Sequence, residues 1–371
     1  MPRLIQAAAY GGQYAGSFIP MLRAALLEAR KRGWQVEAVF PDAVATRSWL
    51  HELTGVGLPV RFLSIERRSN TKAEIARLLL CSSQPTIVHT HFTSFDLPAV
   101  QAARRHSAAA VIWHVHTSAR SHPAIVARNI LKYRLAGRGA ARILCVGPHL
   151  EATVRRRGGG SRVLTFSNAI DVERFSPVSA LERERARRRL GLPLSAQVLL
   201  HLAWDWRQKG GDLLLSALRH LSRESLSPLV LTVGAAAEGR RAARDAGLEA
   251  NVRVLAPVED ARSLYAACDV LVVPSRGEGA PFAVLEALAM GMPVIATRAP
   301  GLSDLEGRPG CRVVARDAQE LAQAIAETLR APISDEERRA ARAWVEAGHD
   351  LSLWASRLLA LYEHVLAELS A

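Results

Sequence analysis

Residues 269–297, DVLVVPSRGEGAPFAVLEALAMGMPVIAT, decide the fold of this chain. Their first apolar run, Val270–Val273, is short, β-branched and apolar on both faces, which is typical of a buried parallel strand. A loop rich in Gly and Pro follows, and the apolar residues after it recur at helical spacing until Gly291 and Pro293 end the helix. Residues 294–296 begin another strand. The stretch is therefore predicted to form a strand, a loop, a helix and a strand.

Two carboxylates lie eight residues apart around the predicted helix start, Glu278 in the loop and Glu286 in the helix. In such a unit the loop leaves the carboxyl end of a strand, and the helix N-terminus presents unpaired N–H groups that suit a diphosphate. The two acids can then contact different parts of one long ligand, one holding sugar hydroxyls and the other a ribose. The alternative is that both are solvated acids on a helix face.

The rest of the chain alternates strand-like and helix-like segments, which predicts an α/β fold. Strands are expected at residues 4–9, 36–40, 86–89, 110–114 and 143–146, and again at 198–202, 229–233, 252–255, 270–273 and 294–296. A helix is expected at residues 17–31, and an amphipathic helix at the C-terminus. Two Rossmann-like, doubly wound parallel-sheet domains follow, joined within residues 167–180.

Composition agrees with a two-domain globular protein, because the 371 residues are 49% hydrophobic and 22% charged. No apolar run reaches the roughly 18 residues of a membrane span, and residues 4–10 are too short for a signal peptide, so a cytoplasmic location is expected. The cysteines have no paired spacing, which indicates buried reduced thiols rather than a zinc site or a disulfide framework. They are Cys81, Cys145, Cys268 and Cys311.

Positive charge is concentrated in the first half of the chain. Residues 1–175 contain 24 Lys and Arg against 10 Asp and Glu, a net charge of +14, and the remainder contains 24 against 25. A basic face can bind nucleic acid, anionic lipid or an acidic acceptor, or can simply favour solubility, and charge alone does not separate these.

Three motifs in order resemble those of family 4 of the retaining glycosyltransferases, which have the GT-B fold. They are SNAID at 167–171 followed by Phe175 and Pro177; KGGD at 209–212; and Asp269, Pro274, Ser275, Glu278, Gly279, Glu286, Ala287 and residues 291–294. The resemblance implies that the two domains face each other across a cleft. It makes residues 1–170 the acceptor-side domain and 171–351 the domain that binds a nucleotide-sugar donor. The helix at about 352–371 would pack back on the first domain; alternatively, it completes the second.

The resemblance also implies site residues. The family places donor contacts in the glycine-rich turn that holds Gly11, Gly12 and Gly16, where backbone N–H groups can approach an anion, although such turns often need Gly for their own geometry. The other implied donor contacts are Arg207, Lys209, Val258, Gly279, Ala280, Pro281, Phe282 and Glu286. The implied catalytic residues are His116 and Glu278.

Lys209 and Arg207 are candidates for neutralising a departing diphosphate. The family usually has an Arg five or six residues before the Lys, where this chain has Ala203 and Trp204. Either Arg207 substitutes or one charge is missing. The alternative is that Lys209 and Arg207 are exposed loop cations.

The implied activity is metal-independent transfer, with retention, of a sugar from a nucleotide-diphosphate sugar to a hydroxyl of a glycan, a lipid-linked saccharide or a small molecule, with no further cofactor. No Asp-x-Asp occurs, and the alternation of His89, His91 and His114 is what any pleated strand produces, so no metal site is expected. The alternatives are a hydrolysing nucleotide-sugar epimerase, or a non-catalytic relative that binds membranes or nucleic acid. Nucleic acid is not the expected partner. Residues 120–142 could lie on an anionic bilayer at the inner face of the membrane, or form a solvated helix face.

Overall fold

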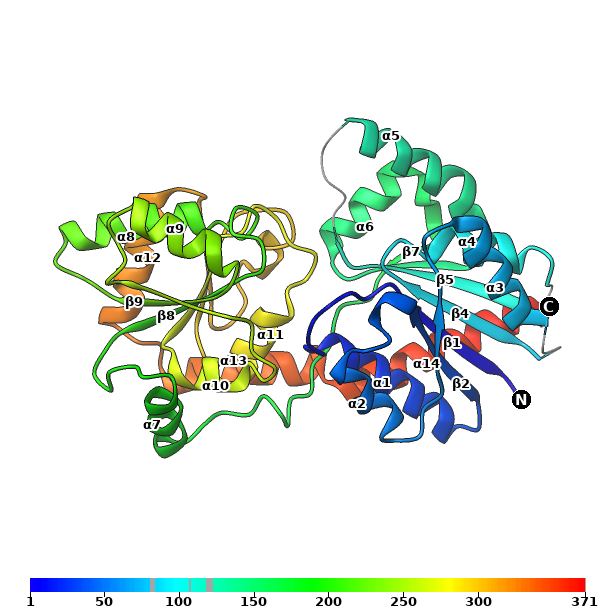
Figure 1. The fold of residues 1–371 in the computed structure, drawn as a ribbon, viewed down its shortest axis with the longest axis horizontal. Helices are drawn as coiled ribbons and strands as arrows, with labels where there is room; N and C mark the ends of the chain where they lie inside the picture. The colour runs from blue at the N-terminus through cyan, green and yellow to red at the C-terminus, as the bar shows by residue number, and fades with distance from the viewer. Residues whose placement is uncertain (81–83, 107, 118–122, 371) are drawn as a thin grey trace. The chain divides into compact units, whose positions relative to one another are not determined.

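The computed structural model describes residues 1–80, 84–106, 108–117 and 123–370 (Figure 1). The prediction for Cys81, and the part of the basic segment at residues 120–122, lie outside the described residues. The chain forms two compact units, one of Met1–Ala169 with Leu351–Ala371 and the other of Ile170–Asp350. We call them the N-terminal unit and the C-terminal unit.

The N-terminal unit contains a seven-stranded parallel sheet in the order β3-β2-β1-β4-β5-β6-β7. The strands are β1 (Arg3–Ala8), β2 (Gln35–Pro41), β3 (Val60–Leu63), β4 (Thr86–His91), β5 (Ala109–Val115), β6 (Arg142–Cys145) and β7 (Val163–Thr165). The helices are α1 (Phe18–Lys31), α2 (His51–Thr54), α3 (Arg68–Leu80), α4 (Asp96–Ala103), α5 (Pro123–Leu131), α6 (Pro148–Val154) and α14 (Leu351–Ser370). The chain order reverses between β1 and β4, which is where ligands bind in such sheets.

The last helix of the chain, α14, belongs to the N-terminal unit and packs beside α1 (Figure 1). Trp354 and Tyr362 of this helix are buried, and the Trp354 indole N–H donates to the Ser167 carbonyl at 2.8 Å. The Tyr362 hydroxyl reaches across the sheet face to Gln6 of β1 and His89 of β4. Residues between 187 and 356 positions earlier in the chain therefore hold this helix in place.

The C-terminal unit contains a six-stranded parallel sheet in the order β10-β9-β8-β11-β12-β13. The strands are β8 (Val198–Ala203), β9 (Leu229–Gly234), β10 (Val252–Leu255), β11 (Val270–Val273), β12 (Val294–Thr297) and β13 (Cys311–Val314). The helices are α7 (Ala180–Arg189), α8 (Gly211–Arg223), α9 (Ala236–Asp245), α10 (Arg262–Ala267), α11 (Phe282–Ala289), α12 (Ala318–Arg330) and α13 (Asp335–His349). Here the order reverses between β8 and β11.

Strand β11 shows why these sheets are buried on both faces. Leu271 and Val273 pack with α10, α11 and α13, whereas Val270 and Val272 pack with α8 and α12 on the opposite face. All four side chains are buried, as the apolar run predicts. The predicted α/β class with two doubly wound parallel sheets is confirmed.

Three strands were not predicted from the sequence: β3, β7 and β13. Each lies at an edge of its sheet and has three or four residues, several of them only half buried. Short runs with mixed exposure carry little of the apolar signal that marks a central strand. The ten predicted strands are all present, with ends within two residues of the expected ones.

The cysteine prediction holds in part. Cys145 and Cys268 are buried free thiols, whereas Cys311 is free but only half buried because it lies in the edge strand β13. Within the described part of the chain, no helix has the length and apolar character needed to cross a membrane.

Candidate functional site

The C-terminal unit brings Lys209 and Glu278 together where β8 and β11 end. The Lys209 ammonium donates to Oε1 of Glu278 at 2.6 Å, although the residues are 69 positions apart. Their side chains are only 14% and 11% exposed. The alternatives of a solvated acid at 278 and an exposed cation at 209 are therefore wrong. Lys209 keeps two further N–H donors and Glu278 a second oxygen for a ligand.

Hydrogen bonds between two loops fix this pair. The Gln208 side chain donates to the Gly277 carbonyl at 3.0 Å, and the Arg276 backbone N–H donates to the Gln208 carbonyl at 2.9 Å. The Arg276 guanidinium binds both carboxylate oxygens of Asp212, at 3.0 and 2.7 Å. Sequence reasoning missed Gln208 and Arg276, because their partners lie in a loop that is distant along the chain.

Two helix N-termini lie at this end of the sheet, where the carboxyl ends of β8 and β11 meet. Helix α8 begins after Gly210 and α11 begins after Pro281, and neither has a side-chain cap. In α8 the Gly211 N–H donates to the Trp206 carbonyl at 2.9 Å, whereas in α11 the Phe282 and Ala283 N–H groups remain available to an anion, with the helix dipole adding positive potential. The approach to α11 consists of half-buried residues, namely Gly279, Ala280, Pro281 and Phe282.

Ser275 belongs to the third sequence motif, but it was not among the predicted binding residues. It follows β11 directly, is 1% exposed, and its hydroxyl has no hydrogen-bond partner among the described residues. A buried hydroxyl without a partner is costly, so a ligand at this edge would gain a hydrogen bond there. A single Ser after a strand gives no signal of this kind in the sequence.

Glu286 lies inside α11 and is 6% exposed. The Tyr265 hydroxyl donates to its Oε2 at 2.5 Å. Burial first, and then the Glu286 charge, raise the pKa of Tyr265 well above its usual value, so the phenol stays a donor. The contact fixes the rotamer of Glu286. Tyr265, on the buried helix α10, reads in the sequence as a core aromatic residue.

The other two predicted donor contacts of this unit, Arg207 and Val258, lie at two different places in its loops. Arg207 is exposed, and its guanidinium has no partner among the described residues. Val258 is half buried in the loop after β10 and packs against the core. Trp204 stands at the sequence position where the family usually has Arg, and the centre of its ring lies 5.7 Å from the Lys209 ammonium.

Gly210 allows the Lys209 loop to pass close to β11. Its φ is +71°, and a Cβ there would lie 1.9 Å from the Pro274 carbonyl oxygen. Gly210→Ala is expected to destabilise the C-terminal unit by about 2 kcal/mol or more, through both the backbone conformation and the clash. Urea unfolding measures the change. The matched control is Gly247→Ala, since Gly247 has φ +68° but open space around its Cβ position. An equal loss in both variants would show that the clash costs nothing.

In the N-terminal unit, the turn after β1 holds the three predicted glycines. A Cβ on Gly12 would meet the Tyr10 hydroxyl at 2.3 Å, and Gly16 has φ +54°. The Gly12 carbonyl also accepts from the Trp49 indole at 3.0 Å. Gly11 has open space around it. Sterics therefore account for glycine at 12 and 16 but not at 11.

His116 follows β5 and ends a chain of hydrogen bonds across the sheet face. Its Nε2 lies 3.0 Å from Nδ1 of His91, whose Nε2 lies 2.6 Å from Oε1 of Gln6. The Gln6 amide donates to the Tyr362 hydroxyl at 2.9 Å. With that amide orientation His91 donates to Gln6 and accepts from His116, which leaves Nδ1 of His116 as an acceptor. Burial, then the neighbouring imidazoles, lower the pKa of His116, so the ring is neutral at pH 7.

His89, His91 and His114 lie together on the same sheet face, with one nitrogen of each within 4.8 Å of the others. Nε2 of His89 and Nδ1 of His114 have no hydrogen-bond partner among the described residues. Strand alternation alone did not predict this cluster, because it depends on the pairing of β4 with β5. The expectation that it binds no metal stays a prediction.

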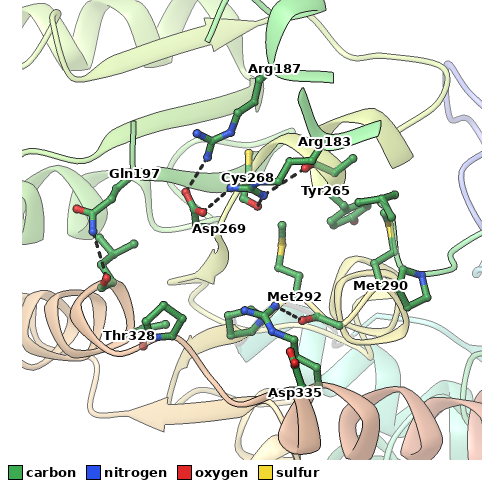
Figure 2. Close-up of a pocket in the computed structure, with 18 of the residues that line it drawn as sticks. Arg183, Arg187, Gln197, Tyr265, Cys268, Asp269, Met290, Met292, Thr328 and Asp335 are labelled. Carbon is green, nitrogen blue, oxygen red and sulfur yellow. Dashed lines mark hydrogen bonds and ion pairs between the residues drawn. The ribbon is translucent and has the colours of Figure 1, made fainter. Parts of the chain in front are cut away.

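A cavity of about 710 Å³ lies at the opposite end of the strands of the C-terminal sheet, beside the amino ends of β8, β11 and β12 (Figure 2). Asp269 binds Arg183 at 2.5 Å and Arg187 at 3.0 Å there, and Arg338 donates to the Gly291 carbonyl at 2.8 Å. Asp269 also accepts from the Val198 N–H, which ties β11 to β8. The charged groups of Asp269, Arg183 and Arg187 therefore stabilise the fold. Lys209 and Glu278 lie at the other end of the sheet, after the carboxyl ends of β8 and β11.

Comparison with known proteins gives matches in both units. Residues 22–174 match Glycosyltransferase Family 4, and residues 196–331 match Glycosyl transferases group 1. A D-inositol 3-phosphate glycosyltransferase of Corynebacterium urealyticum is 34% identical over 49% of this chain and 46% of its own length. One of Xylanimonas cellulosilytica is 30% identical over 68% and 65%. The chain thus spans about half to two thirds of the length of these relatives.

Solved structures share the fold. A glycosyltransferase from Rickettsia africae superposes with a TM-score of 0.82 at 16% identity, over 98% of both chains. Anabaena HepE in complex with UDP superposes with a TM-score of 0.82 at 18% identity, over 98% of this chain and all of the other. The family matches cover both units, and the fold and the motifs agree with them. This chain therefore belongs to family 4 of the glycosyltransferases, the glycosyl transferases group 1.

Proposed function

We propose that the protein transfers a sugar from a nucleoside-diphosphate sugar to a hydroxyl of an acceptor, with retention at the anomeric carbon and without a bound metal or further cofactor. The observation that supports this best is the Lys209–Glu278 pair beside two uncapped helix N-termini at the reversal of strand order. Such an edge suits a diphosphate on one side and sugar hydroxyls on the other.

In the proposed reaction the bond between the anomeric carbon and the diphosphate oxygen breaks, and a bond to the acceptor oxygen forms on the same face. The acceptor proton goes to the departing diphosphate oxygen, and the products are a glycoside and a nucleoside diphosphate. Lys209 and the first N–H groups of α11 stabilise the negative charge that develops on the leaving group. The free oxygen of Glu278 holds a sugar hydroxyl, and Glu286, oriented by Tyr265, binds the ribose.

His116 has the acceptor role in this proposal. Its unprotonated Nδ1 accepts a hydrogen bond from a second hydroxyl of the acceptor, next to the one that attacks, while Nε2 is fixed by His91. We further propose an anionic acceptor, free or lipid-linked, and peripheral contact with the inner face of a membrane. The net charge of +14 on residues 1–175 supports both, and the relatives' name gives an acceptor that carries a phosphate.

The test is incubation of the full chain with a panel of nucleotide sugars and hydroxyl acceptors. We expect release of nucleoside diphosphate that depends on the acceptor, and NMR of the product showing the anomeric configuration of the donor. Inversion would contradict the same-face route. Release without acceptor, together with an isomerised sugar, would instead indicate the hydrolysing epimerase, and no release with any donor would favour the non-catalytic relative.

A further inference from the structure

A groove of about 590 Å³ lies in the N-terminal unit between α4 and Lys132–Ala136, the helical segment that continues α5. Residues from the start of α3, the loop after β4 and both helical segments line it. The lining includes the cations Arg68, Arg104, Arg128 and Lys132, and the apolar residues Ile65, Leu97, Leu131 and Leu135. It is separate from the donor-binding edge, which belongs to the other unit.

The charge of the groove is not neutralised. The guanidinium groups of Arg68, Arg104 and Arg128 have no ion pair or hydrogen bond to the side chains and backbone that the structure describes. Lys132 binds the buried Asp96 at 2.5 Å, and no carboxylate is among the described residues that line the groove. The sequence contributes to this imbalance, because residues 97–150 contain eight Lys and Arg and no Asp or Glu. Three guanidinium groups around one hollow suit a phosphate or diphosphate.

The same groove has an apolar side. Leu131 and Leu135 lie one helical turn apart, and they are 60% and 57% exposed. Large apolar side chains left in water beside cations mark a surface for a molecule with a hydrocarbon part and an anionic part. A small sugar phosphate would satisfy the arginines but would leave both leucines exposed.

The groove leads to His116. A smaller cavity of about 70 Å³ is lined by His114, His116 and Phe92, and it shares Thr93, Asn129 and Lys132 with the groove. Phe92 has a φ of +64°, which a residue without glycine's freedom adopts only at a cost. A ligand with its anionic group at the arginines can therefore extend a hydroxyl toward the His116 ring.

We propose that this groove binds the phosphate and adjoining hydrocarbon of an amphiphilic acceptor, a lipid-phosphate-linked saccharide, and directs its sugar hydroxyl to His116. The inference rests on the proposed transferase function and specifies its acceptor class. Arg68, Arg104 and Arg128 bind the phosphate oxygens, and Leu131 and Leu135 cover the first part of the hydrocarbon.

Binding of dodecyl phosphate to the full chain, measured by calorimetry below its micelle concentration, tests the groove. We expect Arg104→Gln/Arg128→Gln to weaken binding about tenfold or more, because two charge-assisted hydrogen bonds are lost. The matched control is Arg105→Gln/Arg138→Gln, which removes two exposed cations of the same unit that do not line the groove. The control should bind as the parent does, and circular dichroism should show both variants folded.

A second pair of probes tests the apolar side. Leu131→Ser/Leu135→Ser should weaken binding of dodecyl phosphate and leave binding of inorganic phosphate unchanged. If the parent chain bound dodecyl phosphate and inorganic phosphate equally well, the proposal of an amphiphilic acceptor would be overturned. If the arginine variant and its control lost the same affinity for dodecyl phosphate, the assignment of binding to this groove would be overturned. If either occurs while a nucleoside diphosphate still protects the chain against heat, the groove fails and the transferase function stands. Absence of any such protection would count against the transferase function itself.

Discussion

Replacing Lys209 by methionine is expected to lower kcat/KM for sugar transfer by about 10²–10³-fold, the usual loss when one donor to a developing negative charge is removed. Lys209 lies one residue before the N-cap of α8, and its ammonium is held at 2.6 Å from Glu278 in a largely buried position. In such a position the charge acts with little screening by water. Release of nucleoside diphosphate, measured over a range of donor concentrations, gives kcat and KM separately.

The control is Lys31→Met, which removes an exposed lysine of the N-terminal unit and should leave kcat/KM unchanged. Glu278→Gln and the double variant Lys209→Met/Glu278→Gln complete a cycle. Because the two side chains act as a pair, the double variant should be little slower than Lys209→Met alone. A loss below about threefold in Lys209→Met, or fully additive losses in the cycle, would contradict the role assigned here to the pair.

Mild acid is expected to unfold the N-terminal unit before the C-terminal unit. Burial lowers the pKa of His89 and His91 well below the usual value, and that of His114 to about 4. The unfolded chain binds protons on these rings near pH 6.5 and the folded unit does not, so the stability they contribute is complete above that pH and is lost as the pH falls. Each of these rings costs about 1.4 kcal/mol per pH unit, and His116, whose pKa burial lowers in the same way, makes the total up to about 6 kcal/mol per unit for four rings.

The C-terminal unit is the internal control, because one histidine among its described residues is buried, His201, and burial lowers its pKa to about 4. Hydrogen exchange at pH 7.5 and 5.0, corrected for the intrinsic rates, gives the opening free energy of β4 and β8 separately. His114→Gln removes one titrating ring, and its amide can still donate to the Phe166 carbonyl. In this variant the opening free energy of β4 should fall less between pH 7.5 and pH 5.0 than in the parent chain. Equal losses in β4 and β8 would contradict the histidine origin of the acid sensitivity.

The local sequence was enough to predict the elements that are least exposed to solvent. The run at Val270–Val273, the Gly- and Pro-rich loop after it and the helix stop at Gly291 predict β11, α11 and β12 nearly to the residue. Each of these signals depends on neighbours within one element, so no knowledge of the rest of the chain is needed. The edge strands β3, β7 and β13 are short and half exposed, and for them the same signals are weak.

The sequence by itself therefore determined the α/β class, the two sheets and the loops where ligand-binding residues lie. Only the tertiary structure decided the partners of those residues. Lys209 meets Glu278 because β8 lies beside β11, His116 reaches His91 because β5 lies beside β4, and Tyr362 joins Gln6 because α14 packs on the first sheet. Strand order and helix docking result from burying apolar faces over the whole unit, and the periodicity of one segment contains no record of which distant segment will lie next to it.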